Sequence, residues 1–174
     1  RRTRRPAAVA TASGWRAVDE LKAAGLIHAV GAGINERGLM TRFLDLVPVD
    51  AFLVAMPYTL LDQAVLDDEF PACEARGVGF VIGSPYASGI LAKGDTPDAR
   101  YAYAPASDEV RARVRGIAAV CARHRVPLAA AALQFPLGHP AVAAVIPGAS
   151  SQAQAERNVA AFSHPIPADL WAEL

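Results

Sequence analysis

The sequence predicts an α/β fold with parallel strands, and specifically the C-terminal part of a (β/α)8 barrel. Two observations support this prediction. Short apolar runs alternate with amphipathic helical segments, an order typical of parallel strands joined by right-handed crossovers. The turn best suited to phosphate, Ile146 to Ser151, follows the last of these runs, and barrels carry their phosphate sites after the seventh and eighth strands.

A doubly wound sheet is the alternative architecture. Such a sheet usually carries Gly-x-Gly-x-x-Gly in its first turn between strand and helix. The corresponding stretch here, Gly31 to Glu36, supplies the first two glycines and has Glu in the third place. This weak match favours the barrel.

Four apolar runs, each bounded by Gly, Pro or Asn, are predicted to be strands. They are Ile27–Gly33, Val49–Met56, Val78–Gly83 and Val142–Ile146. Continuous rather than alternating apolarity predicts parallel strands that are buried on both faces. A complete barrel has eight strands and about 250 residues, so we expect about four strands of a barrel whose N-terminal half is absent.

Helical patterns precede, separate and follow these runs. They cover Trp15–Ala24, Glu36–Leu46, Gln63–Arg76, Ser107–His124, Leu128–Leu137 and Ser151–Phe162. Ser107 precedes two acidic residues, as is typical of an N-cap and a first helical turn. The polar stretch from Gly94 to Ala106 carries Tyr101 and Tyr103 and is predicted to be a loop long enough to cover a substrate.

Composition restricts the class of protein. The 174 residues include 17 basic and 17 acidic side chains, and this balance gives no general attraction to nucleic acid or to a membrane surface. No apolar run approaches the roughly 20 residues of a membrane span. Cys73 and Cys121 lack the spacing of metal ligands, so we expect reduced, helix-packing cysteines in a cytoplasmic protein without a metal site.

The first residues differ from the rest of the chain. Arg1 to Ala10 are basic and then small, and they lack the sustained apolar centre of a signal peptide. We therefore expect residues 1–14 to be a disordered or non-native leader, and residues 15–174 to form the partial barrel.

The segment from Pro147 to Asn158 is the strongest candidate site. A buried strand that enters a helix through a tight turn aims backbone N–H groups and the positive end of the helix dipole at a bound phosphate. Ser150 or Ser151 can cap this helix, and Gln154 shares one helix face with Asn158. An ordinary capped helix without a ligand is the alternative. The adjoining apolar face is expected to pack on the barrel; it consists of Ala155, Val159 and Phe162.

Two other predicted strand ends carry polar side chains. Ser84 and Ser88 lie in a loop of small residues and could bond a pyrophosphate, although a plain turn is an equal alternative. The amide of Asn35 could pair with a carboxamide, but its position favours capping of the next helix. Tyr58 has no lysine nearby in sequence to lower its pKa, so a packing tyrosine is predicted.

Several motifs, in order along the chain, resemble the aldo/keto reductase family. Ile146 to Ala149, with Gln154 and Asn158, resembles the family's C-terminal cofactor signature, and Ser84-Pro85 with Gly89-Ile90-Leu91 resembles its strand-7 phosphate loop. The segments 21–31 and 57–62 resemble its passages into strand 5 and after strand 6. The sugar-oxidising branch, which includes the L-fucose and D-threo-aldose 1-dehydrogenases, is most similar, on the evidence of Gly31–Asn35, Tyr58–Gln63 and Tyr101–Pro105.

The resemblance implies a barrel that transfers hydride between a nicotinamide and a carbonyl or hydroxyl carbon of a small sugar or aldehyde, here an aldose oxidised at C1. It also implies roles for individual side chains. Asn35 would hold the carboxamide; Ser84, Tyr86 and Ser88 would line the pyrophosphate; Gly148, Ala149 and Ser150 would follow the adenosine ribose; and Asn158 would lie at the adenine.

The resemblance also bears on the choice between NAD and NADP. Family members that use NADP bring Lys and Arg to the 2′-phosphate, and the matching places here are Gly148 and Gln154. A phosphate dianion without cations is costly, so NAD is predicted over NADP. Arg157, where the family usually has Glu, keeps NADP as the alternative. Nearer the nicotinamide, Gly83 and Ala55 replace the aromatic ring and the glutamine that are frequent there.

The family's catalytic Asp, Tyr, Lys and His come from its first four strands, and no segment of this sequence corresponds to them. We therefore expect the chain to be a truncated, inactive piece of an NAD-linked aldose dehydrogenase, with no catalytic residue of its own. Two alternatives stay open. One is a non-catalytic binding or regulatory half-barrel that self-associates through its open edge at Ile27–Gly33, and the other is a different barrel enzyme with a phosphate site.

Overall fold

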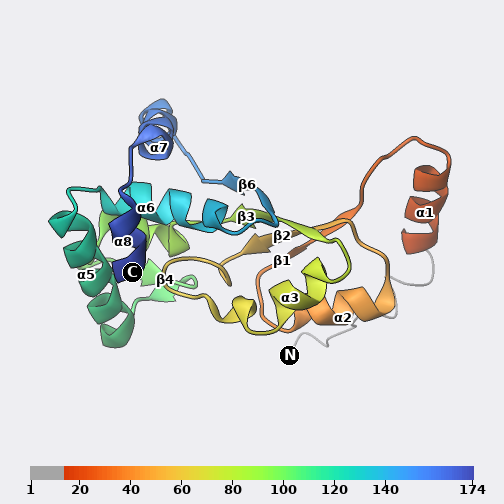
Figure 1. Cartoon of the computed structure of the whole chain (residues 1–174), viewed down its shortest axis with the longest axis horizontal. Coiled ribbons are helices and arrows are strands. Elements are labelled where there is room, and N and C mark those ends of the chain that lie inside the picture. Colours follow the sequence, from red (N-terminus) through yellow and green to blue (C-terminus); the bar gives the residue numbers. More distant parts are fainter. Residues whose placement is uncertain (1–13) are drawn as a thin grey trace.

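The computed structural model describes residues 14–174, and its centre is a sheet of parallel strands. The sheet has the order β1-β2-β3-β6, and each strand runs parallel to its neighbour (Figure 1). The strands are β1 (Gly31–Ile34), β2 (Ala51–Ala55), β3 (Gly79–Gly83) and β6 (Val142–Ile146). The predicted parallel α/β arrangement is confirmed. The predicted leader, apart from Gly14, lies outside the described residues.

Helices separate these strands in the predicted alternation. They are α1 (Trp15–Ala23), α2 (Leu39–Leu46), α3 (Glu69–Glu74), α4 (Ile90–Lys93), α5 (Asp108–Arg123), α6 (Leu128–Gln134), α7 (Gln152–Ser163) and α8 (Ala168–Glu173), with short 3-10 turns η2 (Ala64–Leu66), η3 (Ala87–Gly89) and η4 (Phe135–Gly138). The helix predicted over Gln63–Arg76 is divided into η2 and α3, because Asp68 caps a new helix by accepting from the backbone N–H of Glu69. The sequence reasoning missed α8.

One face of the sheet is buried and the other is open. Phe52, Val54, Phe80 and Ile82 point to the helices and are fully buried, whereas 42% of Leu53, on the opposite face of β2, is exposed. The prediction that the strands are buried on both faces is therefore wrong for the described residues. The inner face of a barrel is covered only when the sheet closes on itself, and four strands leave it accessible.

Gly31 in β1 allows a close approach between strands. A Cβ atom at Gly31 would lie 2.5 Å from the backbone oxygen of Ala51, so a side chain there would collide with β2. Gly31 and Gly33 lie within the strand rather than in the turn after it. Their position rules out the phosphate-binding role that these glycines have in a doubly wound fold.

The segment predicted as a polar loop contains a small hairpin. Strands β4 (Arg100–Tyr101) and β5 (Ala104–Pro105) pair antiparallel, and the two residues between them, Ala102 and Tyr103, both have positive φ. That backbone geometry is typical of a two-residue hairpin turn. Tyr103 stands exposed at the tip.

The two cysteines pack in the interior, as predicted. Both are free and buried, Cys73 under the sheet and Cys121 in the cluster around α4, α5 and α6. Burial raises the pKa of the Cys73 thiol to about 11, which disfavours the reactive thiolate. Within residues 14–174 no three His, Cys, Asp or Glu side chains are grouped to hold a metal ion. In the same part of the chain no helix is long and apolar enough to cross a membrane.

Candidate functional site

The three candidate segments all follow the C-terminal ends of strands. Asn35 follows β1, Ser84 follows β3 and Pro147 follows β6. Because the strands are parallel, these ends lie along the same margin of the sheet. Adjacent strands are about 4.8 Å apart, so β1 and β6 are separated by roughly 14 Å along this margin.

The N-terminus of α7 is held in place by its own first turn. The hydroxyl of Ser151 accepts from the backbone N–H of Gln154 at 3.3 Å. In return, Gln154 Oε1 accepts from the backbone N–H of Ser150 at 2.7 Å and from its hydroxyl at 3.0 Å. This reciprocal pattern resembles a capping box and confirms Ser151 as the cap. It also holds the turn that precedes the helix.

A chain of hydrogen bonds joins the loop after β3 to α7. The hydroxyl of Tyr86 donates to Asn158 Oδ1 at 2.9 Å, and Asn158 Nδ2 donates to the carbonyl oxygen of Gly148 at 3.2 Å. Tyr86 and Asn158 are 72 residues apart in sequence. Burial raises the pKa of Tyr86, which favours the protonated phenol that donates this bond. Three of the predicted cofactor residues therefore make direct contact.

These residues line one cavity of about 250 Å³ between α4 and α7. Four predicted residues contribute to its wall: Tyr86, Gly148, Gln154 and Asn158. Ser88 lines a smaller neighbouring cavity of about 100 Å³, which shares Gly89 and Lys93 with the first. Most of the residues assigned from sequence to the adenosine and pyrophosphate therefore lie along one continuous surface.

The loop after β3 has an unusual backbone. Ser84, Ala87 and Ser88 have φ of 53°, 47° and 62°, in the left-handed region. Such conformations cost free energy for residues other than glycine, and they concentrate at functional sites. Ser84 is half-buried and Ser88 is exposed. The backbone favours the functional interpretation of this loop over a plain turn.

Asn35 does not contact the other candidates. It is exposed at the β1 edge and does not cap α2, which begins at Leu39 behind Gly38 in the left-handed conformation. The capping role favoured by its sequence position is therefore wrong. The cap comes instead from α3, where Glu69 Oε1 accepts from the backbone N–H of Met40 at 2.9 Å. The Asn35 amide has no hydrogen-bond partner among the described residues.

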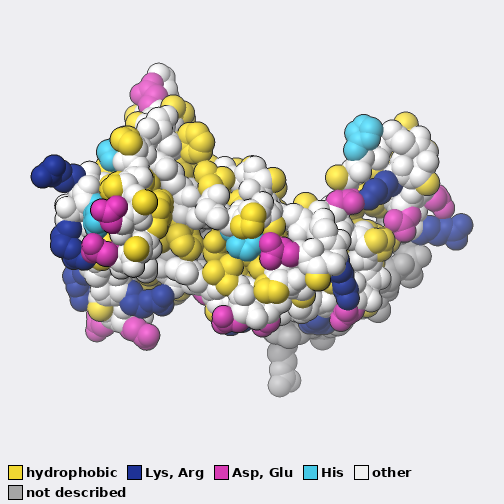
Figure 2. Space-filling model, in the orientation of Figure 1, with side chains coloured by type: hydrophobic (Ala, Val, Ile, Leu, Met, Phe, Trp, Pro, Cys, Tyr) yellow, Lys and Arg dark blue, Asp and Glu magenta, His cyan; other side chains and the backbone are white. Residues whose placement is uncertain are grey.

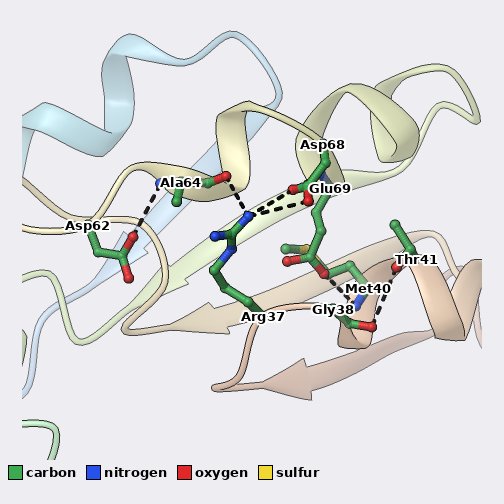
Figure 3. A network of polar contacts seen from close by, with 8 residues as sticks. All are labelled: Arg37, Gly38, Met40, Thr41, Asp62, Ala64, Asp68 and Glu69. Carbon is green, nitrogen blue, oxygen red and sulfur yellow. Dashed lines mark hydrogen bonds and ion pairs between the residues drawn. The ribbon is translucent and has the colours of Figure 1, made fainter.

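The turn that carries Asn35 is nevertheless anchored, as Figure 3 shows. Arg37 Nη2 donates to the carbonyl oxygen of Ala64 at 3.0 Å and to both carboxylate oxygens of Asp68 at 3.3 Å. Together with the bond from Met40 to Glu69, this contact fastens the segment after β1 to η2 and α3. Asn35 therefore lies in a turn whose backbone is held in place by these hydrogen bonds. Ala149, also predicted at the site, is exposed and makes no hydrogen bond within residues 14–174.

Tyr58 is a packing residue, as predicted. Its ring lies 5.0 Å from the ring of Phe70 and 5.3 Å from that of Phe135, between centroids. Burial raises the pKa of the phenol, which makes proton loss harder. This environment does not suit a general acid that works near neutral pH.

Small side chains form the open face of the sheet beside the candidate loops. Ala55 and Gly83 are register partners at the ends of β2 and β3, and Gly83 pairs with Ile146 on its other side. A Cβ atom at Gly83 would meet Ala55 and Leu53 at ordinary contact distance, 3.6 Å. Ala55 is half-buried and Gly83 is buried, so neither position presents a large side chain at this end of the sheet.

Two features of the site differ from the predictions made from sequence. Lys93, the last residue of α4, lines both cavities and is not among the site residues predicted from sequence. The sequence could have indicated this residue, because Lys93 lies only two positions after the Gly89-Ile90-Leu91 motif. The apolar face of α7 does not pack on the sheet, because Val159 and Phe162 are 67% and 60% exposed.

These side chains instead border an apolar groove of about 420 Å³ beside β6. Figure 1 shows α7 standing away from the sheet, and Figure 2 shows hydrophobic side chains along the hollow between that projection and the body of the molecule. The face fails to pack because β6 is an edge strand here.

Comparisons with known proteins agree with this geometry. A model of the aldo/keto reductase family matches residues 5–174. The chain is 40% identical over 167 residues to D-threo-aldose 1-dehydrogenase from a Pseudomonas species. The aligned region covers 95% of this chain and 51% of that protein. It is 38% identical over 167 residues to pyridoxal 4-dehydrogenase from Microbacterium luteolum, covering 96% of this chain and 49% of that protein.

Solved structures give the same result for the fold. The chain superposes on an aldo-keto reductase from Bacillus halodurans, in its holo form, with a TM-score of 0.70 and 27% identity, over 91% of this chain and 53% of that chain. The predicted correspondence with part of a (β/α)8 barrel is confirmed. The chain spans about half the length of the curated relatives it matches.

Proposed function

The chain belongs to the aldo/keto reductase family, and from this premise we propose that it binds a nicotinamide dinucleotide along the C-terminal margin of its sheet. The reaction served by this site is oxidation of an aldose at C1. The relatives named D-threo-aldose 1-dehydrogenase and pyridoxal 4-dehydrogenase support a small sugar or aldehyde as substrate.

The hydrogen-bonded chain from Tyr86 through Asn158 to Gly148 is the observation that supports the binding site best. It connects the loop after β3 with the turn after β6, and the two are linked before any ligand arrives. A site whose polar groups are already in position loses less conformational entropy on binding. The adenosine end of the cofactor fits this preorganised end of the margin.

The remaining roles follow the margin of the sheet. Ser84 and Ser88 would bind the pyrophosphate, and Ser150 would follow the ribose from the N-terminus of α7, where the helix dipole favours negative charge. The nicotinamide ring would lie near the ends of β2 and β3, where Ala55 and Gly83 bring no large side chain, and the amide of Asn35 would bind its carboxamide. The separation of about 14 Å from β1 to β6 suits an extended ligand.

When bound, the nicotinamide supplies the hydride chemistry, and the residues of this chain orient it. The side chains described at the margin hold and position a ligand, whereas Tyr58, the tyrosine nearest in sequence to the β2 end, is buried in an aromatic cluster. We propose that the groups for proton transfer come from outside these 174 residues, so that the chain alone binds cofactor and turns over no sugar.

A cytoplasmic location fits this role. The balanced charge gives the chain no general affinity for nucleic acid or for membranes, and the two free, buried cysteines are what a reducing compartment favours.

Binding of NADH to the purified 174-residue chain tests the proposal. Titration followed by nucleotide fluorescence should saturate, and Asn158→Ala should weaken binding about tenfold, because it breaks the link between the two loops. Ser163→Ala, on the same helix but away from the cavity, is the matched control and should leave affinity unchanged.

Absence of saturable binding would contradict the dinucleotide site. Formation of NADH from NAD and L-fucose by the chain alone would contradict the external origin of the proton-transfer groups.

A second candidate function is a non-catalytic half-barrel that self-associates. It is favoured by the apolar groove beside β6, whose Val159 and Phe162 are largely exposed, and by the unpaired strand edges at β1 and β6. Light scattering on the purified chain separates the candidates. A stable dimer without nucleotide affinity would favour self-association, and a monomer that binds NADH would favour the dehydrogenase site.

A further inference from the structure

We propose that the cavity bordered by η2, η4 and α8 binds a neutral aromatic molecule that carries a hydroxyl group, at a site separate from the dinucleotide margin. The cavity has a volume of about 630 Å³, which is within the usual range of small-molecule sites. None of the residues predicted for the cofactor lines it. Gly138, which lines it, comes before β6, whereas the candidate dinucleotide turn follows β6 at Pro147.

Aromatic side chains form much of the cavity wall. The ring of Phe135 lies 5.3 Å from that of Tyr58 and 6.4 Å from that of Trp171, between centroids, and both pairs are tilted. These three rings and that of Phe162 all line the cavity. Trp171 and Phe162 are exposed, so part of this aromatic wall is left uncovered. A flat aromatic ligand would bury that surface and add aromatic contacts.

The hydroxyl of Tyr58 is a buried donor without a partner. Only 4% of this residue is exposed, it lines the cavity, and its oxygen makes no hydrogen bond within residues 14–174. In that part of the chain the fully enclosed side-chain atoms without a partner are Trp15 Nε1 and Glu69 Oε2, so the Tyr58 oxygen keeps contact with open space. Leaving a buried hydroxyl unpaired costs free energy, which an acceptor on a ligand would recover.

Gln134 provides an acceptor in a fixed orientation at the same cavity. Its Nε2 donates to the carbonyl oxygens of Ala161 and His164, at 2.9 and 2.8 Å. Because carbonyl oxygens only accept, the amide nitrogen must face them. Oε1 is left without a partner among the described residues. The cavity therefore offers one unpaired donor, on Tyr58, and one unpaired acceptor, on Gln134.

Charge and hydrogen bonding select the class of ligand. Within residues 14–174 no Lys, Arg, His, Asp or Glu side chain lines the cavity, so a charged ligand would lose its hydration without gaining a counter-ion. This disfavours a phosphate or a dinucleotide at this place. A hydroxyl group on a neutral ring both accepts a hydrogen bond, as Tyr58 requires, and donates one, as Gln134 requires. These features indicate a phenol or another neutral aromatic alcohol.

Three related probes test the inference by calorimetry on the 174-residue chain. 2-Naphthol offers a donor and an acceptor, 2-methoxynaphthalene offers only an acceptor, and naphthalene offers neither. We expect saturable binding of 2-naphthol. Affinity should fall about fivefold to the methoxy compound and about fivefold again to naphthalene, which is the effect of one neutral hydrogen bond at each step. NADH should not compete with 2-naphthol.

Tyr58→Phe locates the site, because it removes only the hydroxyl and keeps the ring that packs against Phe70 and Phe135. The variant should bind 2-naphthol about fivefold more weakly and should bind naphthalene as the unmodified chain does. Tyr103→Phe is the matched control, because this exposed tyrosine lies at the hairpin tip and does not line the cavity. It should change neither affinity.

Equal affinity for 2-naphthol and naphthalene, or a preference that survives Tyr58→Phe, would overturn the inference. Competition by NADH would also overturn it, by placing the ligand at the dinucleotide margin. So would the absence of saturable 2-naphthol binding, including the case in which sedimentation shows a dimer that covers the cavity. If Tyr58→Phe fails to fold, the comparison of the three probes on the unmodified chain still decides. Selective binding of 2-naphthol without any binding of NADH would overturn only the proposed function.

Discussion

The two edges of the sheet are fastened by different chemistry. At the β1 edge the elements are held by charged groups: Asp50 binds Lys22, Arg37 binds Asp68, and the Glu69 carboxylate caps α2. At the β6 edge α7 is held by neutral side chains: Ser150 with Gln154, Asn158 with Tyr86, and Gln134 with the end of the helix.

The difference bears directly on the candidate site. Exposed ion pairs contribute little to stability and are screened by salt, whereas neutral hydrogen bonds depend little on salt or on pH near neutrality. The proposed adenosine end of the site lies at the neutral edge, and Asn35, the proposed partner of the carboxamide, lies at the charged edge. Changes in pH or salt should therefore loosen the carboxamide end first.

The largest effect is expected at Glu69, a buried polar side chain at the β1 edge. Glu69→Ala removes the acceptor for the backbone N–H of Met40 and leaves a cavity where a side chain only 1% exposed now stands. We expect a loss of about 2–4 kcal/mol in the free energy of unfolding, measured by urea denaturation of the chain.

Glu69→Gln sharpens this result. The amide oxygen of the glutamine keeps an acceptor for the backbone N–H of Met40, and its amide nitrogen takes the place of Oε2, which has no partner in the described residues. A smaller loss for Gln than for Ala is expected. Stability of the Ala variant equal to that of the unmodified chain would contradict a capping role for Glu69.

A smaller effect is expected at the β6 edge from Gln134→Leu. Gln134 Nε2 donates to the carbonyl oxygens of Ala161 and His164, at 2.9 and 2.8 Å, and so holds the C-terminal end of α7. Losing these bonds should cost about 1–2 kcal/mol in the free energy of unfolding, equally at low and high salt.

Gln152→Ala is the control for this prediction. Its side chain bonds only to Glu156 on the exposed side of α7, and its removal should cost under about 0.5 kcal/mol. A strong salt dependence of the Gln134→Leu effect would remove the contrast between the two edges.

The smallest effect concerns Asp50 and pH. The hydrogen bond from Lys22, followed by that from the backbone of Val30, lowers the pKa of Asp50 below its ordinary value. A lowered folded-state pKa means that the stabilisation is fully present above the unfolded value of about 4 and is lost as pH falls through the folded value. The pair is partly exposed, so its contribution is under about 1 kcal/mol.

The position of helix α1 can be used to measure the loss of the contact between Lys22 and Asp50. None of its residues is fully buried, and Lys22 ties it to Asp50, at the start of β2. In a Trp171→Phe background Trp15 is the only remaining indole, and its fluorescence should change as pH falls below about 4. Asp50→Asn should show the same change already at neutral pH. Trp15 fluorescence that changes neither with pH nor with Asp50→Asn would mean that α1 is held by other contacts.

Particular residues show which parts of the structure could be predicted from the sequence. The strand Val142–Ile146 was predicted with its observed bounds. The cap at Ser107 was identified, and the cap of α7 was narrowed to Ser150 or Ser151, because a cap depends on neighbours within one helical turn. The first strand was predicted from Ile27 but begins at Gly31, since apolarity continues through residues that do not pair with β2.

The sequence by itself determined the alternation of strands and helices, the turn at Pro147 and Gly148, and the shared helix face of Gln154 and Asn158. These features follow from short-range hydrogen bonds and from the period of apolar residues. Only the tertiary structure decided which groups meet across long distances in the chain: Glu69 with Met40, and Tyr86 with Asn158. The reason is physical, because such contacts depend on how separate elements pack, and the pattern within each element carries no record of its partner.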